Sequence, residues 1–132
     1  MTLQEREARA CAIIDSMAEE LRDISLYLHD NPELGLNEHK AVKVINQFLE
    51  NHNFTSQVGL TDLPELQTAL RGDYNGTAQH KIAFLGEYDA LPELGHGCGH
   101  NLIAMMSLGA AIAFSQSAPE TWGTTFFGCP AE

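Results

Sequence analysis

The stretch N-L-I-A-M-M-S-L-G-A-A-I-A-F-S-Q-S, from Asn101 to Ser117, contains no charged residue and is apolar on nearly every face. Such a segment predicts a helix that is covered on more than one side. Short apolar segments flank it, at Lys81 to Leu85 and at Thr124 to Gly128, and both are typical of buried strands. This order predicts parallel strands joined by a right-handed crossover helix. We therefore expect an α/β fold with a mostly parallel sheet.

Two helices are expected in the first third of the chain. Apolar residues recur at helical spacing over residues 3–29, and Pro32 ends this helix because proline disfavours a helical residue before it. Asn37 can cap a second amphipathic helix that runs to about His52. Cys11 lies on one face of the first helix and is predicted to belong to the core.

Two more strands are expected before Lys81. Apolar residues alternate clearly from Phe54 to Val58 and weakly from Leu66 to Leu70. The Asn75–Gly76 pair that follows is a strong signal for a hairpin turn, which would join the second of these strands to the one that starts at Lys81.

Composition limits the class of protein. The 132 residues, 44% hydrophobic and 19% charged, suit one globular domain with a real core. The net charge of −11 argues against nucleic acid or an anionic membrane as a partner, because both require a basic face. The charged N-terminus has no apolar signal core, and the longest apolar run, Leu102 to Phe114, is too short to cross a bilayer. Together with three cysteines, an odd number, these features predict a soluble cytoplasmic protein.

Residues with metal-binding chemistry gather in one loop. G-H-G-C-G-H-N, Gly95 to Asn101, follows the acidic stretch E-Y-D-A-L-P-E, Glu87 to Glu93. Cys98 and His100 are two residues apart, so both can reach one metal ion or two adjacent ions. The interleaved glycines would let the backbone crowd around an ion.

A second segment is expected at the same place. The strand at 124–128 leads into G-C-P-A-E, which ends at Glu132. Parallel strands share one carboxyl edge, and ligands bind at that edge of open α/β sheets. Glu132 is therefore expected to face the Cys98 and His100 loop.

Plainer interpretations exist for each of these residues. The glycine loop could be a turn with incidental polar residues, or a phosphate cradle, although its spacing breaks the dinucleotide pattern. Glu132 could be a solvated terminal carboxylate, and Cys129 a small buried thiol at a strand end. The remaining histidines, apart from His96, have no ligand cluster near them in sequence and are predicted at the surface: His29, His39, His52 and His80.

Together these blocks resemble a known family. E-Y-D-A-L-P-x-x-G-H-x-C-G-H-N, a buried helix, then G-x-P-A-E, is similar to the amidohydrolase branch of the aminoacylase and carboxypeptidase family of two-metal zinc peptidases. The stretch L-H-D-N-P-E-L-G-L-N-E-H-K-A, Leu28 to Ala41, resembles the N-terminal signature of that branch. The details are most similar to p-aminobenzoyl-glutamate hydrolase and dipeptidase-like members. The resemblance implies an α/β/α zinc-exopeptidase-like catalytic domain.

The resemblance also implies roles for single residues. Cys98 and His100 would be metal ligands, with Cys98 bridging two divalent ions, zinc or manganese. Asp89 would orient a ligand, with Glu87 beside it, and His96 would be structural. Glu132 would be the general base that takes a proton from the attacking water and returns it to the leaving amine. The substrate would be a small molecule with an amide bond: an N-acyl amino acid, a dipeptide or a p-aminobenzoyl-glutamate-like compound.

The family's next metal-ligating Glu, its later His ligands and its smaller second domain are not in this sequence. The resemblance therefore implies that residues 1–132 are the N-terminal portion of the catalytic domain, cut after the strand–helix–strand unit. We expect metal binding to be weak or absent, hydrolysis to be lost, and surfaces to be exposed through which the chain could form a homodimer. The alternatives are a non-catalytic interaction module and a small structural-zinc or thiol protein.

Overall fold

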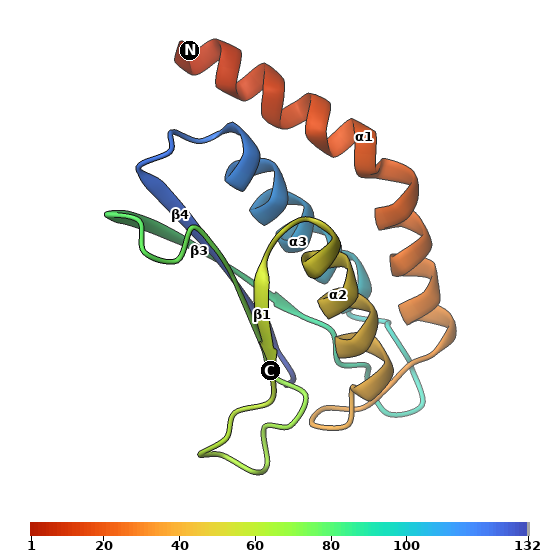
Figure 1. The fold of residues 1–132 in the computed structure, drawn as a ribbon. Helices are drawn as coiled ribbons and strands as arrows, with labels where there is room; N and C mark the ends of the chain where they lie inside the picture. The colour runs from red at the N-terminus through yellow and green to blue at the C-terminus, as the bar shows by residue number, and fades with distance from the viewer. Residues whose placement is uncertain (132) are drawn as a thin grey trace.

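A computed structural model describes residues 1–131 (Figure 1). It contains three helices and four strands among these residues. In chain order they are α1 (Leu3–Asp30), α2 (His39–Asn51), β1 (Thr55–Val58), β2 (Leu70–Tyr74), β3 (His80–Glu87), α3 (His100–Ser117) and β4 (Trp122–Cys129).

The four strands form one mixed sheet in the order β1-β2-β4-β3. β3 and β4 are parallel and α3 connects them, so the predicted α/β class and strand–helix–strand unit are confirmed. The expectation of a mostly parallel sheet is wrong for residues 1–131, because β1–β2 and β2–β4 are antiparallel. The direction reverses between β2 and β3, and β4 then lies parallel to β3 and antiparallel to β2.

The turn at Asn75–Gly76 connects β2 to β3. It is a turn, as predicted, but it joins strands that are not neighbours, because β4 lies between β2 and β3. The Asn75 side chain donates hydrogen bonds to the carbonyl oxygens of Glu120 (2.9 Å) and Trp122 (3.1 Å), and so holds the start of β4 against the turn. The predicted hairpin is therefore absent.

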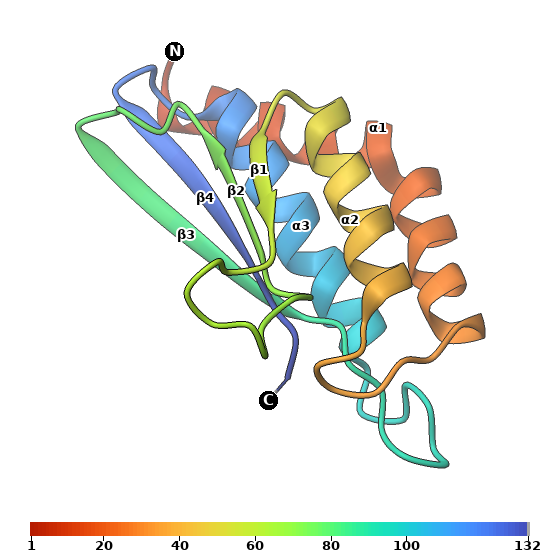
Figure 2. The same cartoon turned by 60° about the horizontal axis from the view of Figure 1, so that its bottom comes forward.

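All three helices lie on one face of the sheet (Figure 2). α3 lies directly on the sheet with α2 beside it, and α1 packs outside them. Residues 1–131 supply no helix to the other face, where Leu85 is 55% and Phe127 37% exposed. The described part of the chain thus forms one helical side of the expected α/β/α arrangement.

The helical predictions hold in most details. α1 ends at Asp30, before Pro32, and α3 matches the predicted 101–117 within one residue. α3 is buried at most positions, although Leu102 and Met106 are exposed. No helix within residues 1–131 is long and apolar enough to cross a membrane.

Three local predictions are wrong. The strand expected at 66–70 lies at 70–74, because the preceding residues turn, with the Leu66 N–H bonded to the Leu63 carbonyl. Cys11 is exposed, because it lies on the face of α1 that turns away from the core. Asn37 does not cap α2; the Glu33 carboxylate accepts the backbone N–H groups of the helix start instead, those of Lys40 and Ala41.

Candidate metal centre at the carboxyl edge of the sheet

The parallel strands end side by side. Glu87, the last residue of β3, is paired in register with Cys129, the last residue of β4. The loop that carries Cys98 and the segment that follows β4 therefore leave the sheet at the same edge, as predicted (Figure 2).

His100 and Asp89 meet at this edge. His100 is the first residue of α3 and is 5% exposed. Its Nδ1 lies 2.9 Å from Asp89 Oδ1 and 3.0 Å from the Asp89 carbonyl oxygen. Both oxygens are acceptors, so Nδ1 carries a proton, and in the neutral ring Nε2 has the lone pair that can bind a metal ion. A carboxylate behind a metal-binding imidazole is the usual arrangement in protein metal sites.

Cys98 lies in the loop just before α3 as an exposed thiol. The conformation of this loop depends on glycine: Gly95 and Gly99 have φ of +60° and +88°, values that L side chains rarely adopt. A Cβ at Gly99 would meet no atom within 4 Å. The positive φ is therefore what requires glycine at this position among the described residues, and close approach of the backbone to an ion stays a prediction.

The described residues do not complete an ion-binding set. Within residues 1–131, no three His, Cys, Asp or Glu side chains come close enough to hold a metal ion. The structure brings Asp89 and His100 together but does not join Cys98 to them. Glu132, the predicted general base, lies outside the described residues.

Two further side chains near the edge have shifted pKa values. Burial lowers the pKa of His96, and the nearby His100 adds to the effect, so His96 favours its neutral form. Its Nδ1 is buried and has no hydrogen-bond partner in the described part of the chain. Burial raises the pKa of the Cys129 thiol, and the charge of Glu87 raises it further. Cys129 is half-buried, and it is less enclosed than predicted.

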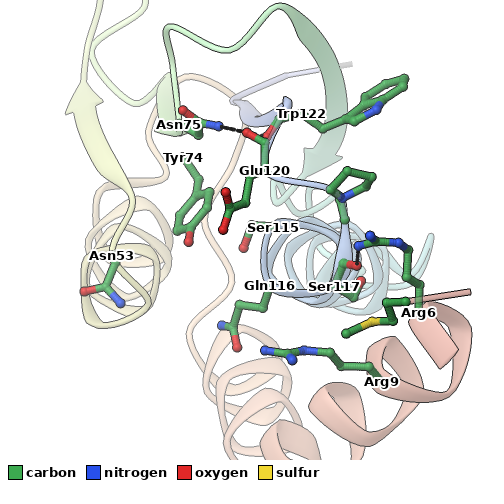
Figure 3. Close-up of a pocket in the computed structure, with 13 residues that line it drawn as sticks. Arg6, Arg9, Asn53, Tyr74, Asn75, Ser115, Gln116, Ser117, Glu120 and Trp122 are labelled. Carbon is green, nitrogen blue, oxygen red and sulfur yellow. Dashed lines mark hydrogen bonds between the residues drawn. The ribbon is translucent and has the colours of Figure 1, made fainter.

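A separate hollow of about 830 Å³ lies at the opposite end of the sheet (Figure 3). Arg6 and Arg9 of α1 line it, together with Tyr74 at the end of β2 and Trp122 at the start of β4. No His or Cys lines it. It therefore has cationic and amide groups but none of the soft ligands found near α3.

No family model matches the chain. Individual proteins do match it. The chain is 36% identical over 94% of its length to a mouse Xaa-Arg dipeptidase, of which it covers 31%. It is 31% identical over 90% of its length to one of the subunits of p-aminobenzoyl-glutamate hydrolase from Escherichia coli, of which it covers 28%. Among solved structures, a dinuclear metal binding peptidase of the M20 family from Bacillus subtilis matches with a TM-score of 0.75 and 25% identity, over 89% of this chain and 36% of that one.

The chain belongs to the amidohydrolase branch of the aminoacylase and carboxypeptidase family. An aminobenzoyl-glutamate utilization protein from Klebsiella pneumoniae shares the fold, with a TM-score of 0.69 at 17% identity. The chain spans between a quarter and a third, 26–31%, of the length of these curated relatives.

In this family member, sequence reasoning missed a buried polar cluster next to the site. Glu38 and Thr68 are both fully buried, and the Thr68 hydroxyl donates to the Glu38 carboxylate at 2.6 Å. The fully buried Tyr88 donates its hydroxyl to the Thr68 carbonyl oxygen. Burial raises the pKa of Glu38, although hydrogen bonds from Thr68 and the backbone oppose this, and burial also raises the pKa of Tyr88. The one feature of the sequence that could have drawn attention to Glu38 is its position inside the 28–41 signature.

Proposed function

We propose that residues 1–132 are the N-terminal portion of the catalytic domain of a metal-dependent amidohydrolase. Its substrate is an N-acyl amino acid, a dipeptide or a p-aminobenzoyl-glutamate-like compound. The observation that carries the proposal is the Asp89–His100 pair at the carboxyl edge of β3 and β4. The dipeptidase and hydrolase names of the relatives support the substrate class.

The donor atoms present fit a divalent metal. Cys98 and His100 supply a thiol and an imidazole, the ligand types that zinc prefers, and they would hold one ion each or share a pair of zinc or manganese ions. A bound divalent ion would polarise the amide carbonyl of the substrate. Asp89 holds the proton on His100 Nδ1 and fixes the ring orientation.

Glu132 is proposed as the general base. It accepts the proton of the attacking water and delivers it to the amine that leaves. Because the ligands within residues 1–131 are few, the chain by itself is expected to bind metal weakly and to leave amide substrates intact.

Metal titration tests the ligand assignment. Zn²⁺ and Mn²⁺ are titrated calorimetrically into the 132-residue chain and into Cys98→Ala and His100→Ala. Each substitution should weaken residual Zn²⁺ binding by about tenfold or more, which is ~1.4 kcal/mol. His29→Ala is the matched control, because His29 is exposed and, among the described residues, its side chain bonds only its neighbour Asp30. Equal loss in the control would contradict the assignment.

Activity tests the base. In a chain extended to the length of the relatives, Glu132→Gln should abolish hydrolysis of N-acyl amino acids and p-aminobenzoyl-glutamate while metal stays bound. Unchanged turnover in Glu132→Gln would remove Glu132 from the mechanism. Tight binding of two Zn²⁺ ions with amide cleavage by the 132-residue chain would overturn the expected inactivity.

Self-association is proposed through the sheet face that carries Leu85 and Phe127, which no described helix covers. Sedimentation at rising concentration should show a dimer that Leu85→Lys weakens. A monomer well above micromolar concentration would contradict it.

A further inference from the structure

The 28–41 signature lies against both segments that leave the carboxyl edge. The Ala90 N–H donates to the Glu33 carbonyl oxygen at 2.7 Å, and Leu34 forms a parallel bridge with Ala90. The Leu36 N–H lies 3.3 Å from the Pro130 carbonyl oxygen. The signature therefore bonds on one side to the segment after β3 and on the other to the segment after β4.

The side chains of the signature fix it in place. The Glu33 carboxylate accepts the N–H groups of Lys40 and Ala41 at the start of α2, at 2.8–3.0 Å. The Glu38 carboxylate accepts the Leu36 N–H at 2.9 Å. Glu33 and Glu38 thus both use their carboxylate oxygens on donors within the chain.

The same network reaches the residue before Asp89. The Glu38 carboxylate accepts a hydrogen bond from the Thr68 hydroxyl, and the Tyr88 hydroxyl donates one to the Thr68 carbonyl oxygen. The Tyr88 ring also lies close over β4: a Cβ at Gly128 would meet Tyr88 Cε1 at 2.8 Å. Because Tyr88 precedes Asp89 in the chain, anchoring its side chain restricts the backbone from which Asp89 reaches His100.

We propose that residues 33–38, with Thr68 and Tyr88, form a brace that sets the position of Asp89 and His100 relative to the segment after β4, with Glu38 as its central positioning residue. The catalytic meaning of the brace rests on the proposed function, but the brace can be tested without metal or substrate. Its role is to hold the Asp89–His100 bond and the separation of the two segments, and it contacts no reacting atom.

The chain offers a matched control. Thr125, also buried, donates to the carboxylate of Asp73 at 2.6 Å, the same distance as Thr68 to Glu38, but in the middle of the sheet. Thr68→Val and Thr125→Val each remove one such bond. Thr68→Ser keeps the hydroxyl and serves as the conservative rescue.

Two NMR readouts follow the brace in the metal-free chain. In Thr68→Val the amides of Leu36 and Ala90 should exchange about tenfold faster than the change in global stability explains, and the ring ¹⁵N resonances of His100 should shift. In Thr125→Val and Thr68→Ser both readouts should follow global stability alone. Equal behaviour of Thr68→Val and Thr125→Val would overturn the brace.

If Thr68→Val does not fold, Tyr88→Phe replaces it, with Tyr74→Phe as control, and the same two readouts decide. Zn²⁺ titration separates the two proposals. In a chain extended to the length of the relatives, a Thr68 effect without Zn²⁺ binding at Cys98 and His100 supports the brace and contradicts the proposed function. Zn²⁺ binding without any Thr68 effect contradicts the brace and leaves the proposed function in place.

Discussion

Two threonine–carboxylate hydrogen bonds of equal length lie in contrasting surroundings. Both Thr68–Glu38 and Thr125–Asp73 measure 2.6 Å. For each acid, burial is the largest influence on the pKa and raises it. Asp73 also has hydrogen bonds from Thr125 and Arg71 and the positive charge of Arg71, and its pKa is lowered; Glu38 has no cation, and its pKa is raised. Glu38 is fully buried with no cation beside it, whereas Asp73 is partly exposed and has a cation as well as its threonine bond, and these differences give the two pKa values opposite directions.

The largest difference between the two pairs should appear on removal of the acid. Glu38→Ala leaves the buried Thr68 hydroxyl without its acceptor and takes one of two acceptors from the Leu36 N–H, which keeps the Pro130 carbonyl. We expect a loss of about 2–4 kcal/mol in the free energy of unfolding. Asp73→Ala should cost less, about 1–2 kcal/mol, because only the Thr125 hydroxyl loses a buried acceptor, while Arg71 is half-exposed and can turn to water. Urea unfolding measures the loss of unfolding free energy in both variants. Equal losses would contradict the expected difference between the two pairs.

Glycines near the two ends of β4 provide the next test. Gly128→Ala would place a Cβ 2.8 Å from the Tyr88 ring and 2.9 Å from Leu70 Cβ, so we expect about 1–3 kcal/mol of destabilisation. Gly76→Ala, whose nearest atom is at 3.6 Å, is the control and should change stability by less than about 0.5 kcal/mol. If Gly128→Ala also speeds Ala90 amide exchange beyond the global change, the Tyr88 contact carries the effect to the site.

The dependence of stability on pH should have opposite signs for the two acids. The raised pKa of folded Glu38 means that the folded state holds the proton more tightly, so this contribution falls as pH rises above about 4.5, its ordinary value. The lowered pKa of Asp73 gives a contribution that is present above about 3.8 and is lost as pH falls further. Unfolding free energies of Glu38→Gln and Asp73→Asn between pH 3 and 7, each subtracted from wild type, check both slopes. Slopes of the same sign would contradict the assignment of the two environments.

The smallest effect is expected at Arg71. Its guanidinium bonds Asp73 at 2.8 Å and lies 5.8 Å from the centre of the Phe127 ring, on the uncovered sheet face. Arg71→Gln should cost about 0.2–1 kcal/mol and should cost less in high salt, because exposed ion pairs are screened. Thermal unfolding at two salt concentrations measures it. If salt does not change the loss of stability, the loss comes from the contact of Arg71 with the Phe127 ring and not from the ion pair with Asp73.

The sequence predicted those parts of the fold that depend on local pattern. The uncharged α3, the strands on either side of it and the shared edge at Glu87 and Cys129 follow from hydrophobic periodicity and one topological rule. The position of β4 between β2 and β3 could not be predicted, because the Asn75–Gly76 turn has the chemistry of a hairpin. β4 enters this place through long-range pairing with β2 and β3, and Asn75 adds side-chain bonds to the carbonyls of Glu120 and Trp122.

The candidate site was predicted to the same extent. The resemblance implied that Asp89 orients a ligand, and in the structure Asp89 bonds His100; the metal-binding roles of Cys98 and His100 and the catalytic role of Glu132 stay predictions. Glu38 was not predicted to matter, because its partner Thr68 lies 30 residues away in a stretch without a clear pattern. A buried acid at the start of an amphipathic helix has the same sequence signature as an exposed one, and only the fold distinguishes them.

The place of β4 has a consequence for how the sheet is completed. β2 and β3 each pair with β4 and not with each other, and β4 is the last strand of the chain described. During synthesis β2 and β3 each keep one unpaired edge until the residues after Trp122 emerge. β4 can then pair with both of them. The contacts that it makes are distant in sequence, so we expect sheet formation to be a late and slow step of folding. A nascent chain stalled before Trp122 should contain α1 and α2 without a joined sheet.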